Sequence, residues 1–167
     1  MEKKLKKAVY PGTFDPLTNG HMSLVLRGLD IFDEIVVGVA LHSPKDPLFN
    51  LEERVKMTRK AFSEYPRVRV EPFEGLLVEY VISQKAVAIL RGMRAVADFE
   101  YEFQMALMNR RLDRNIQTVF LMTDYKWLYI SSTLIKDVAR LGGDIKGLVP
   151  ANIEQDLYRK FGRLQHS

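Results

Sequence analysis

The stretch that decides the fold is YPGTFDPLTNGH, residues 10–21, which lies between a short apolar run and a helical pattern. Its two glycines let a ligand approach the backbone closely, and its two prolines fix the turns. The unpaired amides at the start of the following helix favour an anion there. The stretch therefore predicts a phosphate-facing loop, with His21 on the first turn of the helix.

Around this loop, short apolar segments alternate with helical patterns. The expected strands lie at residues 8–10, 35–40, 68–70, 86–90 and 118–122. The expected helices lie at residues 20–29, 51–62, 76–83, 96–112, 131–142 and 151–161. The third strand resembles an edge strand, because charge interrupts its alternation. This order predicts an α/β fold, a Rossmann-like doubly wound sheet of five parallel strands. We expect one domain over residues 1–167, with residues 1–6 as a basic extension.

Composition excludes several classes of protein. Without cysteine the chain has neither disulfides nor thiolate metal sites, and a reducing cytoplasm is the simpler location. The net charge of +4 comes mainly from the lysine-rich residues 1–7, so the rest of the chain offers little for nucleic acid. The longest apolar runs are too short to cross a bilayer, and no signal peptide is evident. We expect no nucleic-acid or membrane partner.

His21 has two interpretations. A lone histidine at a helix start is usually a solvated surface residue, but the glycine-rich loop before it favours a functional role. Neither the dinucleotide fingerprint nor the Walker pattern is present, so a mononucleotide would be held in some other way. The position supports a ligand site, because ligands of doubly wound sheets bind beyond the carboxyl ends of the strands.

Two further clusters follow predicted strands. Arg91 and Arg94 flank Gly92 and Met93, and they either form ion pairs with acidic neighbours in the next helix or bind a phosphate, which we favour. Lys45 could add a third cation. The run Ser131-Ser132-Thr133 either caps a helix or offers hydroxyls and amides to a second phosphate.

The long helix expected at residues 96–112 carries two apolar stripes. The first holds Phe99, Phe103, Ala106 and Leu107, and the second holds Tyr101, Met105, Met108 and Leu112. We expect one stripe to pack on the sheet and the other to contact a second subunit, which predicts a homo-oligomer. The three histidines, at positions 21, 42 and 166, have no metal-ligand spacing.

Together these motifs resemble a known family. Residues 10–21, YPGTFDPLTNGH, which end in TNGH, resemble the stretch that carries the T/H-x-G-H signature of the nucleotidyltransferase superfamily. Residues 90–102, LRGMRAVADFEYE, and residues 127–133, WLYISST, resemble the bacterial phosphopantetheine adenylyltransferase branch, which acts in coenzyme A biosynthesis. The resemblance covers roughly residues 7–161, and the stretch from 90 to 102 is the part that is specific for the branch.

The resemblance implies an activity and a set of contacts. ATP and 4′-phosphopantetheine would give dephospho-coenzyme A and pyrophosphate, with Mg²⁺ that arrives with ATP and has no direct protein ligand. It also implies a homohexamer and feedback inhibition by coenzyme A. Phosphopantetheine would contact Thr13, Lys45, Leu77 and Arg91. ATP would contact Thr13, Phe14, His21, Gly92, Met93, Arg94, Glu102, Trp127, Leu128, Tyr129, Ile130, Ser131, Ser132 and Thr133.

The chemistry of such a reaction agrees with these residues. A phosphate monoester is mostly dianionic at neutral pH, so it attacks directly, without a protein base or a covalent intermediate. The barrier is electrostatic, and cations and amide dipoles lower it. We therefore expect His21, as a cation-like donor, and Lys45 to stabilise the transition state, Arg91 to hold the acceptor phosphate, and Arg94 to hold the ATP phosphates.

Three questions stay open at this stage. A related transferase could use another acceptor, such as nicotinamide mononucleotide or glycerol phosphate. A nucleotide-binding sensor without turnover is a further alternative. The role of Asp15 is also open, because it could orient a neighbouring amide or belong to the surroundings of the metal.

Overall fold

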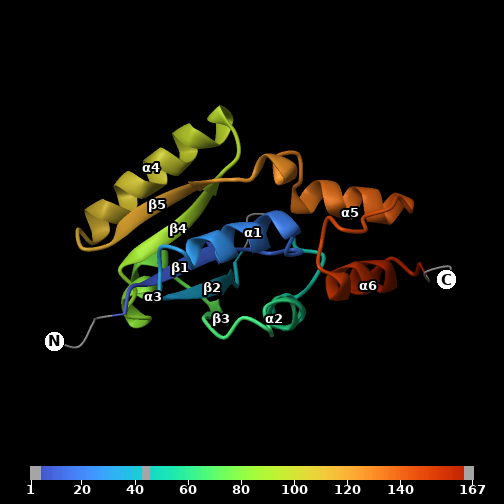
Figure 1. Cartoon of the computed structure of the whole chain (residues 1–167), viewed down its shortest axis with the longest axis horizontal. Helices are drawn as coiled ribbons and strands as arrows, with labels where there is room; N and C mark the ends of the chain where they lie inside the picture. The colour runs from blue at the N-terminus through green and yellow to red at the C-terminus, as the bar shows by residue number, and fades with distance from the viewer. Residues whose placement is uncertain (1–4, 43–45, 164–167) are drawn as a thin grey trace.

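The computed structural model describes residues 5–42 and 46–163. Five parallel strands form one sheet in the order β3-β2-β1-β4-β5, which confirms the predicted fold class (Figure 1). The strands are β1 (Lys7–Gly12), β2 (Glu34–Ala40), β3 (Val68–Phe73), β4 (Ala88–Met93) and β5 (Gln117–Met122). Strand β3 lies at an edge of the sheet, as its charged alternation predicted.

Strand β4 is longer than predicted. Arg91 and Gly92 were expected just after the strand, but both pair with β5, opposite Phe120 and Leu121. A polar pair at the end of an apolar run resembles a loop in the sequence, and only the pairing with β5 keeps it extended. This extension determines the face of the sheet on which Arg91 lies.

In the described part of the chain, six helices connect and follow the strands, all near the predicted positions. They are α1 (Asn19–Gly28), α2 (Leu51–Ala61), α3 (Leu77–Ser83), α4 (Val96–Leu112), α5 (Ser132–Leu141) and α6 (Ala151–Lys160). A short 3-10 helix, η1 (Tyr125–Trp127), precedes α5 and was not predicted. Side-chain capping explains where some of the helices start: Asn50 and Glu53 form a capping box at α2, and Ser131 accepts a hydrogen bond from the Leu134 amide at α5.

Alternating side chains divide the core between the two faces of the sheet. Ala8, Tyr10 and Leu90 belong to the larger core, to which α1, α2, α5 and α6 contribute, and we call this side the α1 face. Val9 and Ile89 belong to a smaller core with α3, on the side that we call the α4 face. Successive residues of a strand point to opposite faces, so Tyr10 and Arg91 lie on opposite sides of the sheet.

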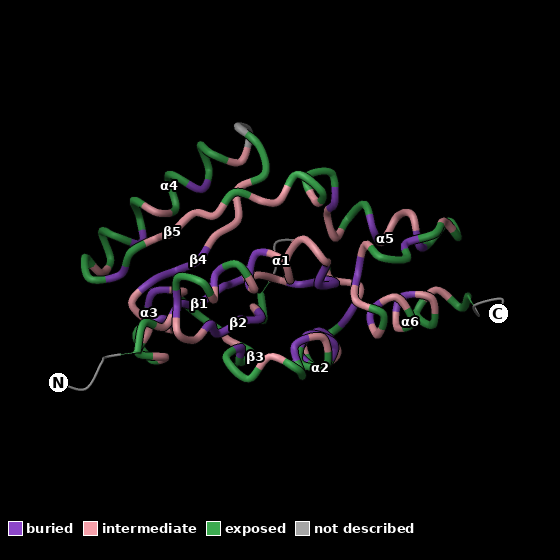
Figure 2. Tube along the Cα trace, in the orientation of Figure 1, coloured by how far each residue is buried: buried purple, intermediate pink, exposed green. Residues whose placement is uncertain are grey.

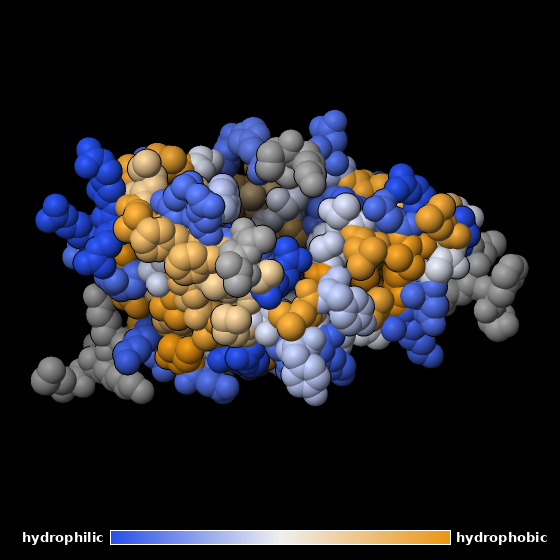
Figure 3. All heavy atoms as spheres, turned by 90° about the horizontal axis from the view of Figure 1, so that it is seen from above, coloured by the Kyte–Doolittle hydropathy of each residue, from blue (hydrophilic) through white to orange (hydrophobic). Residues whose placement is uncertain are grey.

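The packing of α4 differs from the prediction. Its buried residues are polar, Glu102 and Asn109, at 8% and 7% exposure, whereas no apolar stripe packs on the sheet among the side chains that the structure describes. Both stripes are exposed (Figures 2 and 3), with these members: Phe99, Tyr101, Phe103, Met105, Leu107, Met108 and Leu112. The reason is Arg91, which lies on the strand beneath and pairs with the Glu102 carboxylate.

Across residues 5–42 and 46–163, none of the helices has the length and apolar character that a membrane span requires.

Candidate active site

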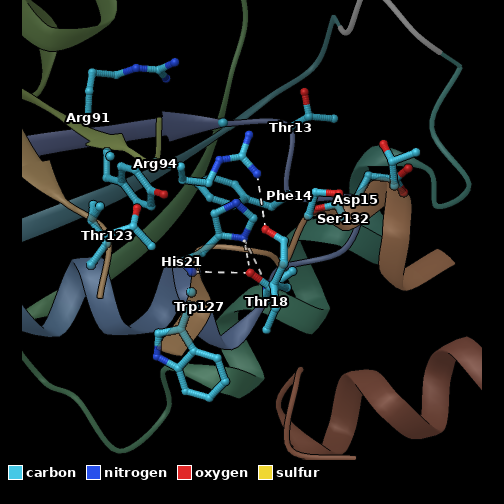
Figure 4. Close-up of a pocket in the computed structure, with 18 of the residues that line it drawn as sticks. Thr13, Phe14, Asp15, Thr18, His21, Arg91, Arg94, Thr123, Trp127 and Ser132 are labelled. Atoms are coloured by element: carbon cyan, nitrogen blue, oxygen red, sulfur yellow. Dashed lines mark hydrogen bonds between the residues drawn. The ribbon is translucent and has the colours of Figure 1, made fainter. Parts of the chain in front are cut away.

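A cleft of about 450 Å³ opens at the carboxyl edge of the sheet (Figure 4). The loop after β1, the end of β4, η1 and the start of α5 form its walls, so the segments that the sequence singled out converge here. The predicted residues that line it are Thr13, Phe14, His21, Arg91, Gly92, Arg94, Glu102, Trp127, Ile130, Ser131, Ser132 and Thr133. Met93, Leu128 and Tyr129 do not line it, and Lys45 lies outside the described residues.

The His21 ring is held by the cap of its own helix. Its Nδ1 atom accepts a hydrogen bond from the Thr18 backbone amide at 3.0 Å and lies 3.1 Å from the Thr18 hydroxyl (Figure 4). Because Nδ1 accepts from the amide, a neutral ring carries its proton on Nε2. The capping box of α1 therefore sets both the orientation and the tautomer of the imidazole.

The charge of His21 differs from the prediction. Removal from water, together with the positive charges of Arg94 and Arg91, lowers the pKa of His21 to about 4. The imidazole is therefore neutral at pH 7, and its Nε2–H is a neutral donor. This corrects the expectation of a cation-like group.

Arg91 points away from His21 in Figure 4, toward the α4 face. Glu102 binds its guanidinium from the side, with Nε 2.9 Å from Oε2 and Nη2 2.5 Å from Oε1. Nη1 donates to the Pro11 carbonyl at 3.2 Å. Of the five N–H groups of a guanidinium, these contacts use three and leave one on each terminal nitrogen for another acceptor. The ion pair and a role in anion binding are therefore compatible.

Arg94 joins the end of β4 to the segment before α5. Its Nη1 donates to the Ile130 carbonyl at 3.2 Å, and its Nε lies 3.6 Å from the Asp98 carboxylate. Asp98 and Glu102 thus both form the ion pairs that the alternative interpretation of the two arginines anticipated. Nearly half of the Arg94 side chain stays exposed in the cleft.

Two of the three hydroxyls at the start of α5 have structural partners. Ser131 caps the helix through the Leu134 amide, and Ser132 donates to the Pro16 carbonyl at 2.7 Å. The cap uses the Leu134 amide, and the two residues before it in the first turn, Ser132 and Thr133, both line the cleft. A helix start of this kind favours an anion.

A second, smaller cavity of about 180 Å³ adjoins the cleft on the α4 face. Its large apolar and aromatic lining residues are Leu77, Phe73, Tyr101 and Met105. Both cavities have the following residues in common: Pro11, Gly12, Thr13, Arg91 and Glu102. The two spaces therefore meet where β1 and β4 end.

Residues 9–138 match the model of the cytidylyltransferase-like family. A phosphopantetheine adenylyltransferase of Nitratidesulfovibrio vulgaris is 62% identical over 161 residues, which are 96% of this chain and 87% of the relative. That of Oleidesulfovibrio alaskensis is 64% identical over 157 residues, 94% of this chain and 92% of the relative. That of Desulfosudis oleivorans is 54% identical over 158 residues, 95% and 94% of the two chains. The chain belongs to the phosphopantetheine adenylyltransferase family. The resemblance predicted from the sequence is confirmed.

Within this phosphopantetheine adenylyltransferase fold, Asp15 has a structural role that the sequence left open. The buried carboxylate accepts hydrogen bonds from the amides of Leu48 and Phe49, each at 2.9 Å, and from the Lys136 ammonium at 2.6 Å. It thereby holds the loop before α2 and the helix α5 against the loop after β1. Sequence reasoning missed Lys136, although it follows Ser132 by one helical turn and so lies on the same side of α5.

Arg54 is a second residue that sequence reasoning missed. Its side chain is almost fully buried and donates to the carbonyls of Phe49, Thr13 and Ala40, at 3.1, 2.8 and 2.8 Å. These contacts join the loops that follow β1 and β2, at the edge of the sheet where the cleft opens. In the sequence, Arg54 lies among the charged residues of an amphipathic helix, and no local signal distinguishes it.

Among the residues that the structure describes, no three His, Asp or Glu side chains are arranged to hold a metal ion.

Proposed function

We propose that the protein transfers the adenylyl group of ATP to 4′-phosphopantetheine, giving dephospho-coenzyme A and pyrophosphate. The observation that carries the proposal is the pair of adjoining cavities on opposite faces of the sheet, which share Thr13 and Arg91. One cavity has donors suited to a triphosphate, and the other has apolar walls and a guanidinium. The names of the relatives supply the two substrates.

On the α1 face, the cleft offers donors to the phosphates of ATP. We assign the β- and γ-phosphates to Arg94 and the first-turn amides of α5. Arg94 donates to the Ile130 carbonyl just before that helix, so the two groups belong to one wall of the cleft. Trp127 and Phe14 provide aromatic surface in the same cleft. We assign this cleft to ATP.

On the α4 face, the smaller cavity suits the pantetheine arm. Leu77, Phe73 and Met105 provide apolar contacts, and Arg91 lies where this cavity meets the ATP cleft. The two remaining N–H groups of its guanidinium would bind the phosphate of the acceptor. Bound there, the acceptor phosphate reaches the junction of the cavities, beside Thr13.

The reaction then needs positioning and charge stabilisation. The acceptor phosphate arrives largely deprotonated and attacks the α-phosphate in line, so no base is required. The neutral Nε2–H of His21 donates to an α-phosphate oxygen as negative charge grows there. The role of Lys45 as a second stabilising group remains a prediction, because this residue lies outside the described part of the chain.

The cleft fits a magnesium ion that is held by ATP. Three of the four carboxylates that line it have cationic partners: Asp15 binds Lys136, Asp98 binds Arg94, and Glu102 binds Arg91. The fourth, Asp46, belongs to no group of three possible metal ligands among the described residues. Mg²⁺ usually keeps several waters and binds phosphate oxygens, so a dedicated protein cage is unnecessary. When bound with ATP, the ion would neutralise charge on the phosphates and on the departing pyrophosphate.

The exposed face of α4 supports an oligomer. Seven large apolar side chains on one helix are exposed in the monomer, among them Leu107 and Met108 at 53% each. A contiguous apolar surface of this kind marks a protein contact, and we propose a homohexamer, as the family resemblance implies. Coenzyme A shares the pantetheine arm with the acceptor, so it would compete for the same cavity and inhibit. The absence of cysteine supports a cytoplasmic location.

A turnover assay tests the proposal. The purified protein is mixed with ATP, Mg²⁺ and one acceptor from a panel of phosphopantetheine, nicotinamide mononucleotide and glycerol phosphate, and pyrophosphate release is measured. We expect rapid release with phosphopantetheine alone. Release only with another acceptor would assign the protein to a related transferase. Tight ATP binding without any product would indicate a sensor.

A further inference from the structure

Tyr10 is a residue of the cleft to which the family motifs give no role. It lies on β1, on the α1 face, and is only 6% exposed although it lines the cleft. Its ring meets Phe14 edge-on, with 5.4 Å between the ring centroids, and lies 6.4 Å from the ring of His21. The strand and these two neighbours therefore hold the phenol in one place, beside the donor assigned to the α-phosphate.

The Tyr10 hydroxyl forms no hydrogen bond with any residue that the structure describes. Tyr80 offers a useful comparison, because its hydroxyl also has no partner there. The Tyr80 hydroxyl, however, is sealed from solvent, whereas Tyr10 lines an open cleft. Phenylalanine would fill the same space at either position without an unpaired polar group. At Tyr10, a molecule in the cleft is able to supply the missing partner.

Charges around the phenol favour an anionic partner. The positive charges of Arg91 and Arg94 lower the pKa of Tyr10, and the negative charge of Glu102 raises it. Burial is the largest effect, and it raises the pKa of Tyr10 far above neutrality, so the hydroxyl keeps its proton. The phenol is therefore a protonated donor on which two guanidinium charges act, in a cleft whose charge attracts phosphate.

We propose that the Tyr10 hydroxyl donates a hydrogen bond to a phosphate oxygen of the nucleotide, which makes Tyr10 a further catalytic residue beside His21. The nucleotide is favoured over the acceptor, because Tyr10 lines the cleft on the α1 face and is not among the residues of the smaller cavity. The inference rests on the proposed function in one respect, that the cleft binds ATP.

The variant Tyr10→Phe tests this, because it removes the hydroxyl and keeps the ring. We expect kcat/KM for ATP to fall by about 10- to 100-fold, the range for a lost hydrogen bond to a charged group. The KM for phosphopantetheine and the thermal midpoint should stay within twofold and about 2 °C of the parent. The matched control is Tyr80→Phe, which removes an unpaired hydroxyl outside both cavities and should leave turnover unchanged.

Three results would overturn the proposal. They are a kcat/KM for ATP within twofold of the parent, a change confined to the acceptor KM, and an equal loss of every activity together with a lower thermal midpoint. If the parent does not turn over phosphopantetheine, calorimetry with ATP and Mg²⁺ still decides. Weaker ATP binding by Tyr10→Phe, by about fivefold or more, supports the hydrogen bond, and unchanged binding contradicts it.

Discussion

The two faces of the sheet meet at one edge but are built differently. On the α1 face, four helices cover a large core, and the neutral imidazole of His21 lines the cleft at its edge, with Nδ1 accepting from the Thr18 amide. On the α4 face, the core is small, the charged Arg91 is paired with Glu102, and the apolar residues of α4 are exposed. One face is complete within a single chain. The other has an apolar surface that stays exposed in the single chain.

This difference has a chemical counterpart. A neutral donor in a rigid setting suits charge that develops during a reaction, because it needs no rearrangement when that charge appears. A paired guanidinium suits a phosphate that is charged before and after the reaction, because its remaining N–H groups stay available. The comparison predicts that substitutions on the α1 face change kcat, whereas those on the α4 face change acceptor binding or assembly.

The largest effect is expected from His21. His21→Ala should lower kcat by about 10²–10³-fold, since one lost transition-state donor costs roughly 3–4 kcal/mol. His21→Gln should lower kcat similarly while its side chain keeps the capping box with Thr18. Steady-state kinetics measure kcat, and the exposed His42→Ala serves as a control that leaves it unchanged. A near-native kcat in both His21 variants would remove the imidazole from the mechanism.

A smaller effect is expected on the α4 face. Arg91→Met should raise the KM for phosphopantetheine by about 10- to 100-fold, because it removes charged hydrogen bonds, with little change in the KM for ATP. It also leaves the buried Glu102 without its partner and lowers the thermal midpoint. Arg91→Met/Glu102→Gln should restore the midpoint but not the KM. If the double variant also restores acceptor binding, Arg91 acts only through the fold.

The apolar surface of α4 gives a prediction about assembly. Met108→Glu should weaken subunit association by at least about tenfold, because it places a charge within an apolar contact. Light scattering coupled to size exclusion measures the mass of the particles. Glu100→Lys, on the exposed side of the same helix, is the control for a change of charge alone. An unchanged mass for Met108→Glu would place the subunit contact elsewhere.

The smallest expected effect is a change of the free energy of unfolding with pH, which arises from His21 on the α1 face. The pKa of His21 is about 4 in the folded protein and roughly 6.5 in an unfolded chain. Between these values the unfolded state binds more protons than the folded state, so the free energy of unfolding rises with pH. The contribution of His21 to that free energy is lost as pH falls toward 4. Denaturation at several pH values should show a steeper slope for the parent than for His21→Gln.

Nitrogen NMR of the ligand-free protein tests the same property directly. We expect a neutral His21 ring, with the proton on Nε2, from pH 8 down to about pH 5. A ring that titrates near pH 6.5 would mean that burial and the charges of Arg94 and Arg91 do not act on it as the structure indicates. The neutral-donor mechanism would then be wrong.

The sequence by itself determined the order of strands and helices, the parallel sheet and the place of the site. Apolar runs, the spacing of apolar residues in helices and the loop at residues 10–21 are local signals. The carboxyl ends of parallel strands share one edge, so the segments around His21, Arg91 and Ser131 were expected to meet. They do.

The tertiary structure alone decided on which face of the sheet each side chain of the site lies and what charge it carries. Asp15 and Lys136 are 121 residues apart, and Arg54 reaches carbonyls of three separate segments. The burial of Glu102 depends on its ion pair with Arg91. The position of Arg91 depends on the pairing of β4 with β5. The neutrality of His21 depends on burial and on two distant arginines. No local pattern contains these relations, because the contacts form only when remote segments pack together.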